Sequence, residues 1–122
     1  MATASRGADR LAIAVFVRAP AAGAAKTRLI PALGAAGAAR LQRRMAVHAL
    51  EVAQRVETGP VAIWAAPDAE HRFFRAVQRH CVVGVHAQAG ADLGERMAAA
   101  FAAQAGPLLL IGSDCPALQP AP

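Results

Sequence analysis

The run of apolar residues from Leu11 to Val17 constrains the fold of this chain more than any other stretch. Its seven residues read LAIAVFV and include no polar side chain, so they lack the alternation of a strand with one wet face. A continuous apolar strand is typical of a parallel sheet that helices cover on both faces. We therefore expect an α/β fold whose first strand is buried on both sides.

Helical and strand patterns alternate along the rest of the chain. Apolar residues at helical spacing, opposite a row of arginines, predict an amphipathic helix. The next helix should bury Phe73, Phe74 and Val77, and the last should bury Met97 and Phe101. The expected elements are a helix over 35–56, a strand from Val61 ended by Pro67, a helix from an N-cap at Asp68 through Arg79, a strand over 81–87, a helix capped by Asp92 with Glu95 completing a capping box, and a strand over 108–112.

This order of elements predicts a Rossmann-like, three-layer α/β/α architecture with a mainly parallel sheet and right-handed crossovers. A length of 122 residues fits one domain. We expect a loose N-terminal segment over residues 1–10 and a single, partial domain over 11–122. The stretch PALQPAP closes the chain where such a fold ordinarily needs another helix, so the domain is expected to be truncated at its C-terminus.

Charge and composition argue against several classes of function. The net charge of +5 comes from twelve arginines and one lysine against eight acids, but the arginines lie beside acids along helical segments without interleaved aromatics. We therefore expect no nucleic-acid partner, although small phosphorylated ligands stay open. Cys81 and Cys115 form no C-x-x-C pair, and the four histidines lack ligand spacing, so neither a disulfide scaffold nor a zinc site is expected.

The N-terminal region imitates a secretory signal only loosely. Arg6 and Arg10 precede the apolar run and small residues follow it, as in a signal peptide. However, the run is at the lower limit of length, Asp9 interrupts the positive end, and Arg18 follows at once. No segment approaches the apolar length needed to span a bilayer. We expect a cytoplasmic protein without a membrane partner.

The atypical residues gather in loops that follow strands. The segments 18–28, 92–96 and 113–116 come after the first, third and fourth expected strands. Ligands of open α/β sheets bind beyond the carboxyl ends of the strands, where loops enter helices. All three segments are therefore expected at one edge of the sheet, as a candidate binding site.

The first of these loops has the chemistry of a diphosphate site. Small residues let the backbone approach a ligand, Gly23 can take a positive φ, and Lys26, Thr27 and Arg28 supply donors suited to phosphate oxygens. The loop is not a Walker A motif, because Ala25 stands where that motif needs glycine. A solvated basic turn is the alternative explanation.

An acidic residue follows the fourth strand. Asp114 comes directly after LLLIGS and shortly before Pro116, which stiffens the turn, so its carboxylate can hold a hard cation such as Mg²⁺ against a nucleotide phosphate. Capping of the next turn explains Asp114 equally well. In the segment DLGERM a capped helix explains Asp92 entirely, and a ribose or base contact from Asp92, Gly94 or Arg96 is indicated only by position.

Three stretches together resemble a known family. FVRAPAAGAAKTRLIPALG, ADLGERMAAAF and LLLIGSDCPAL occur in this order, and they resemble the bacterial radical-SAM/selenodomain-associated glycosyltransferase-like proteins, also catalogued as a domain of unknown function. That family lies in the nucleotide-diphospho-sugar transferase superfamily, which has a glycosyltransferase A-type fold. The resemblance covers residues 11 to about 119.

The resemblance implies a nucleotide site. Lys26 and Arg28 would act on the phosphates of a nucleoside triphosphate or nucleotide-sugar as the catalytic cations, and Asp114 would ligate Mg²⁺ or Mn²⁺. From the chemistry of the loop itself, Arg18, Gly23 and Thr27 are expected to complete nucleotide binding there. Arg18 stands where the family commonly has lysine, which keeps the charge and changes the donor geometry.

The resemblance also implies a transferase of sugar or nucleotidyl groups with an unknown acceptor. Family members continue past the DCP turn with further strands and a second acidic, glycine-rich motif, which this chain lacks. Whether the chain is itself an enzyme is therefore left open. The alternative is a noncatalytic remnant that binds nucleotide weakly or associates with copies of itself through an open sheet edge.

Overall fold

The computed structural model of the chain describes residues 10–21 and 30–112. Strands and helices alternate from the first element to the last. The elements are β1 (Ala12–Arg18), α1 (Ile30–Val56), β2 (Val61–Ala66), α2 (Arg72–His80), β3 (Gly84–Ala87), α3 (Leu93–Ala103) and β4 (Leu108–Gly112).

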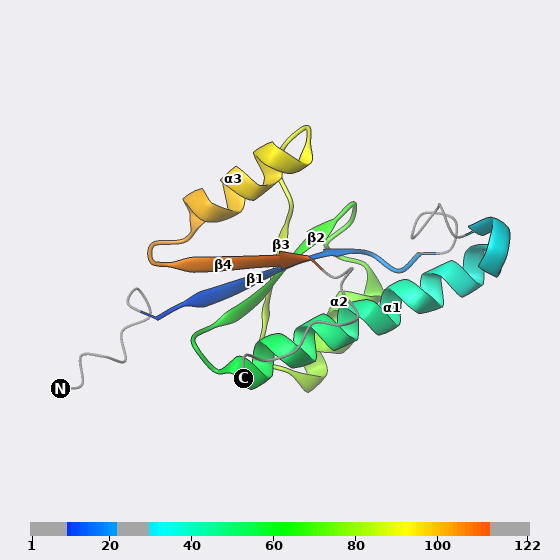
Figure 1. Ribbon diagram of the computed structural model, residues 1–122, viewed down its shortest axis with the longest axis horizontal. Coiled ribbons are helices and arrows are strands. Elements are labelled where there is room, and N and C mark those ends of the chain that lie inside the picture. The colour runs from blue at the N-terminus through cyan, green and yellow to red at the C-terminus, as the bar shows by residue number, and fades with distance from the viewer. Residues whose placement is uncertain (1–9, 22–29, 113–122) are drawn as a thin grey trace.

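The four strands form one parallel sheet in the order β3-β2-β1-β4. β1 occupies an inner position, and all its residues are buried except Arg18 at its end. Helices α1 and α2 cover one face of the sheet and α3 covers the other (Figure 1). The predicted three-layer α/β fold, with its first strand buried on both sides, is confirmed.

The core lies mainly between the sheet and the α1–α2 layer. Alternate residues of β1 and β2 point to this side, and Ile13, Val15 and Ile63 are almost fully buried there. α1 meets them with alanines, whose small side chains let the helix approach closely. Phe73 and Phe74 of α2, packed edge to face with ring centroids 5.4 Å apart, complete the cluster. This layer therefore fixes the helices that flank the carboxyl edge of the sheet.

The helix starts differ from the sequence-based expectations at two places. α2 begins at Arg72, and its N-cap is His71, whose Nδ1 accepts a hydrogen bond from the Phe73 backbone nitrogen at 3.1 Å. The prediction that Asp68 caps this helix is wrong, because its carboxylate closes a local turn with the Glu70 nitrogen instead. α1 begins at Ile30 rather than at the predicted residue 35. It contains a non-helical Gly34 with φ of 75°, so only its regular part begins near residue 35.

Two expectations for β3 and α3 are also wrong. β3 covers only Gly84–Ala87 rather than 81–87, because Cys81 still hydrogen-bonds to Val77 at the C-terminus of α2. Phe101, expected to be buried, is 47% exposed, and the buried residue of α3 is Ala100. None of the helices within the described ranges is long and apolar enough to cross a membrane.

Candidate functional site

Arg18 is the last residue of β1 and lies at the carboxyl edge of the sheet. Ile13, Val15 and Val17 belong to the α1–α2 core, so the alternation of side chains places Arg18 on the α3 face. Its carbonyl oxygen accepts a hydrogen bond of 2.8 Å from the side chain of Gln42. Gln42 is 2% exposed, so a buried amide ties α1 to the end of β1.

The other described candidates lie in the first turn of α3, at the same edge and on the same face as Arg18. Asp92 is the N-cap, and its Oδ1 accepts from the Glu95 nitrogen at 2.8 Å. Arg96 donates from Nε to the Gly90 carbonyl at 3.1 Å. Gly94 lies between them in the turn. Asp92, Gly94 and Arg96 thus share the first turn of α3, and their role in binding a ligand stays a prediction.

The capping box at this turn is offset by one residue. Glu95 accepts a hydrogen bond of 2.9 Å from the Ala91 nitrogen rather than from the N-cap residue itself. The second carboxylate oxygen of Asp92 has no hydrogen-bond partner among the described residues. An exposed carboxylate with a free oxygen at a helix start can accept hydrogen bonds from hydroxyl groups of a ligand.

Gly90 is a further residue that shapes this turn. Its φ is 137°, and a Cβ there would lie 2.7 Å from the Glu95 Cβ and 2.8 Å from the Arg96 nitrogen. Only glycine fits this position. Gly90 is not among the residues predicted from the sequence, although a glycine between a strand and an N-cap aspartate is a turn signal that could have identified it.

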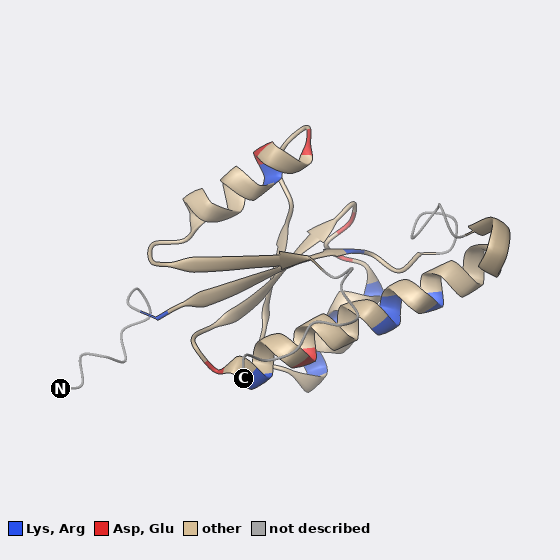
Figure 2. Ribbon diagram, in the orientation of Figure 1, with Lys and Arg blue, Asp and Glu red and all other residues tan. Residues whose placement is uncertain are grey.

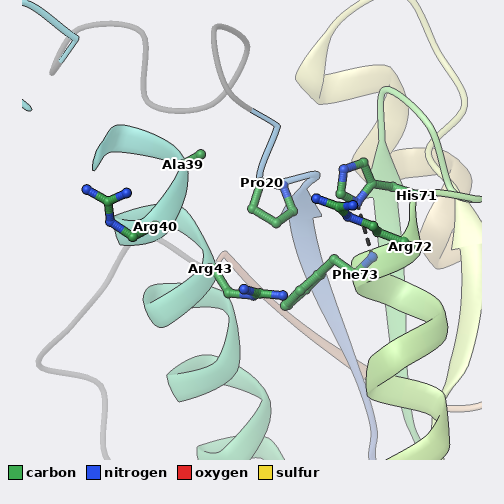
Figure 3. Close-up of a pocket in the computed structure, with 7 residues that line it drawn as sticks. All are labelled: Pro20, Ala39, Arg40, Arg43, His71, Arg72 and Phe73. Carbon is green, nitrogen blue, oxygen red and sulfur yellow. Dashed lines mark hydrogen bonds between the residues drawn. The ribbon is translucent and has the colours of Figure 1, made fainter. Parts of the chain in front are cut away.

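A small basic pocket lies at the same edge on the opposite face, between α1 and α2. Its volume is about 90 Å³. Figure 3 shows Arg72 beside His71 and Pro20, Arg43 reaching from α1 toward Phe73, and Arg40 directed away at the α1 rim. The pocket is lined by Pro20, Ala39, Arg40, Arg43, His71, Arg72 and Phe73.

The helical spacing of apolar residues predicted that Arg40 and Arg43 lie on the solvent-facing side of α1. Figure 2 shows that basic positions follow α1 and α2 while the sheet carries almost none. Among the described residues, Arg75 forms an ion pair with Glu70 at 3.6 Å. Arg72 at the start of α2 could have indicated an anion-binding site in the sequence. A cation at a helix N-terminus is electrostatically unfavourable unless an anion lies nearby.

The remaining predicted site residues, Gly23, Lys26, Thr27, Arg28 and Asp114, lie outside the described residues. Their proposed convergence therefore stays a prediction. Within residues 10–21 and 30–112, no three His, Cys, Asp or Glu side chains are grouped to hold a metal ion. In the α3 turn, Asp92 and Glu95 each accept one capping hydrogen bond.

Comparison with known proteins adds to this geometry. The family model of an "uncharacterized protein conserved in bacteria" (DUF2064) matches residues 49–122. None of the curated proteins with which the chain was compared is significantly similar to it.

A crystal structure from Desulfovibrio desulfuricans G20, described as a "putative nucleotide-diphospho-sugar transferase", is similar over 91% of the chain, with 32% identity and a TM-score of 0.76. The chain spans about half of that protein's length, since the match covers 50% of it. The architecture described above is therefore that of a nucleotide-diphospho-sugar transferase fold.

Proposed function

The chain belongs to the bacterial DUF2064 family, and from this premise we propose that it binds a nucleoside triphosphate or nucleotide-sugar and takes part in transferring a sugar or nucleotidyl group. The observation that carries the proposal is the match to a nucleotide-diphospho-sugar transferase fold at 32% identity over 91% of the chain. The chain spans about half of that relative. Nucleotide binding is therefore the main claim of the proposal, and transfer of a group by this chain is its second claim.

The described part of the edge supports a nucleotide on the α3 face. Arg18 and the first turn of α3 lie at the carboxyl ends of β1 and β3, where α/β sheets bind ligands. The Arg18 guanidinium is exposed and can pair with a phosphate. The free oxygen of Asp92 can accept from a ribose hydroxyl, and Gly94 leaves space for the sugar or base to approach the turn. Arg96 is held by Gly90 and orients the turn.

The segment between β1 and α1 supplies the phosphate-binding groups in this proposal. Lys26 and Arg28 neutralise charge on the phosphates and on the leaving group, and they are the catalytic residues. Thr27 adds a hydroxyl donor, and Gly23 allows close approach of the backbone. The segment connects two ordered elements, since Ala19 hydrogen-bonds to Ala66 of β2 at 2.7 Å and Gln42 of α1 holds Arg18.

Asp114 is the proposed ligand of Mg²⁺ or Mn²⁺. It follows Gly112 by two residues in the sequence, and Gly112 pairs with Phe16 near the end of the neighbouring β1. A carboxylate is the ligand type that a hard cation prefers. When bound, the metal would supply Lewis-acid stabilisation of phosphate charge. Asp68 and Asp92, the described aspartates near this edge, each use one carboxylate oxygen in a turn or a cap.

Titration calorimetry with nucleoside triphosphates and nucleotide-sugars tests the proposal. We expect binding that strengthens in Mg²⁺, and a loss of at least tenfold in affinity for Lys26→Ala and Arg18→Gln, since charge-assisted hydrogen bonds contribute about 1.5–3 kcal/mol each. Asp114→Asn should remove the Mg²⁺ dependence. Arg79→Gln is a matched control, because Arg79 is an exposed arginine at the far end of α2.

Two outcomes would contradict the proposal. Absence of nucleotide binding by the folded wild-type chain would reject it outright. Equal affinity of wild type, Lys26→Ala and Asp114→Asn would reject the assigned roles. Association through a sheet edge also remains a prediction: β4 is an edge strand of the described sheet, and sedimentation analysis would detect a dimer.

A further inference from the structure

The basic pocket continues into a larger groove on the outer side of α1 and α2. The groove has a volume of about 510 Å³, within the range of about 300–1,000 Å³ that small-molecule sites occupy. Arg43 and Phe73 line both cavities, with the Arg43 guanidinium 5.9 Å from the centre of the Phe73 ring. The Arg43–Phe73 pair therefore lies where the basic compartment meets the mainly apolar one.

The wall of the groove is mainly apolar. Leu50 and Phe73 form its floor as members of the core, and Val77 and Cys81 pack against that core from α2. Val47 on α1 is 37% exposed although it is aliphatic. Polar groups, including Glu51, Arg55 and His80, also line the groove. A surface of this kind gains free energy when an apolar group displaces its water.

The basic compartment has donors without a matching anion. Neither Arg43 nor Arg72 forms an ion pair among the described residues, and the first turn of α2 contains no acid. Because the Nδ1 of His71 accepts the Phe73 N–H, its Nε2 carries the proton in the neutral ring and is a donor. Two guanidinium groups, one imidazole N–H and the start of a nine-residue helix therefore surround one small space.

We propose that the two compartments together bind one amphiphilic phosphate monoester, with its phosphate between Arg43, Arg72 and His71 and its apolar chain in the groove. The positive charge of the basic pocket favours a phosphate group. Because the apolar groove adjoins that pocket, a phosphate that carries an apolar chain fits the site better than a free anion does. The site lies on the α1–α2 face, whereas Arg18 and the α3 turn lie on the opposite face at the same edge. This binding does not rest on the proposed function.

Octyl phosphate, kept below its micelle concentration, is the probe for calorimetry. We expect it to bind at least tenfold more tightly than inorganic phosphate or octanol. Arg43→Gln and Arg72→Gln should each weaken octyl phosphate at least tenfold, and Arg44→Gln should not, because Arg44 is an exposed neighbour on α1 that lines neither cavity. Val47→Gln should weaken octyl phosphate at least threefold and leave inorganic phosphate unchanged.

Several outcomes would overturn the inference. Equal affinity for octyl phosphate and inorganic phosphate would show that the groove does not bind the apolar chain. Unchanged affinity of both folded arginine variants for octyl phosphate would show that the basic pocket does not bind the phosphate. Binding to vesicles containing phosphatidic acid without binding to monomeric octyl phosphate would indicate a membrane surface instead. If nucleotides bind while octyl phosphate does not, this inference fails and the proposed function stands. The reverse result rejects the proposed function alone.

Discussion

The two faces of the sheet differ in how they hold the helices that cover them. On the α1–α2 face, β1 and β2 contribute Ile13, Val15 and Ile63 to a continuous buried cluster with Phe73 and Phe74. On the α3 face, Ala100 is the buried residue of the covering helix, while Leu93 and Phe101 are 62% and 47% exposed. Trp64 and His86 stack there, with ring centroids 4.7 Å apart, and are only partly covered.

The difference indicates two ways of positioning a site. On the α1–α2 face, the arginines are positioned because the helices that carry them are packed against the core. A change that weakens this packing therefore lowers the stability of the fold and also moves the arginines. The start of α3 is placed by local hydrogen bonds among Gly90, Asp92, Glu95 and Arg96. We therefore expect substitutions on the first face to change global stability strongly, and substitutions on the second to change the local turn more than the whole fold.

The largest expected effect comes from truncating the buried aromatic residue of α2. Phe74 is 1% exposed, and Phe74→Ala should lower the free energy of unfolding by about 3–5 kcal/mol because it leaves a cavity in the core. Phe101→Ala on α3 should lower it by less than about 1 kcal/mol. Urea denaturation followed by circular dichroism measures both. If Phe74→Ala does not fold, Phe74→Leu should still show a loss of about 1 kcal/mol, and equal losses for the two helices would refute the comparison.

The same contrast explains which features the sequence could predict. The unbroken apolar run of β1 identified a strand buried on both faces, because burial leaves a direct mark on composition. Phe101 was misassigned because helical spacing reports a repeating apolar side without reporting whether a neighbour covers it. Asp68 was misassigned because an aspartate forms a local turn as readily as a helix cap.

The candidate site was only partly predictable for a related reason. Strand ends locate an edge, so Arg18 and the Asp92–Arg96 turn were found from their positions. The pocket of Arg43, His71 and Arg72 joins residues that are far apart in the sequence. No local sequence pattern predicts that arginines on two different helices lie close together. Lys26, Arg28 and Asp114 stay predictions, because they lie outside the described residues.

The next largest effect is expected at the turn before α3. Gly90→Ala introduces a Cβ about 2.7 Å from that of Glu95 at a φ of 137°, and it should destabilise the turn by about 1–3 kcal/mol. Gly94→Ala is the matched control, because its Cβ would meet only Asp92 Oδ1 at 3.4 Å and alanine is the better helix former. Hydrogen exchange should show faster exchange in α3 than in α1 for Gly90→Ala. Uniform acceleration across both helices would contradict local positioning.

Loss of the α3 cap should have a smaller effect. Asp92→Ala removes the acceptor of the Glu95 N–H and should cost about 1 kcal/mol, as for other N-caps. Asp92→Asn retains an acceptor oxygen and should cost only a few tenths. Thermal unfolding gives the order of the three proteins. If Asn behaves like Ala, the cap hydrogen bond is not what holds this turn, and the contrast between the two faces loses its basis on the α3 side.

The smallest expected effect tests whether the α1–α2 face is optimised for stability. Gln54 lies in the groove wall, and its side-chain nitrogen is buried without a hydrogen-bond partner among the described residues. Gln54→Met keeps the length of the side chain and removes the unsatisfied donor, so it should raise the free energy of unfolding by about 1 kcal/mol.

Gln78 on α2 is the matched control, because its Nε2 donates to the Val83 carbonyl at 3.2 Å. Gln78→Met should therefore lower stability by about 1 kcal/mol. Opposite signs in urea denaturation would show that the groove retains a polar group at the expense of folding, whereas a loss in both variants would mean that Gln54 is satisfied in solution.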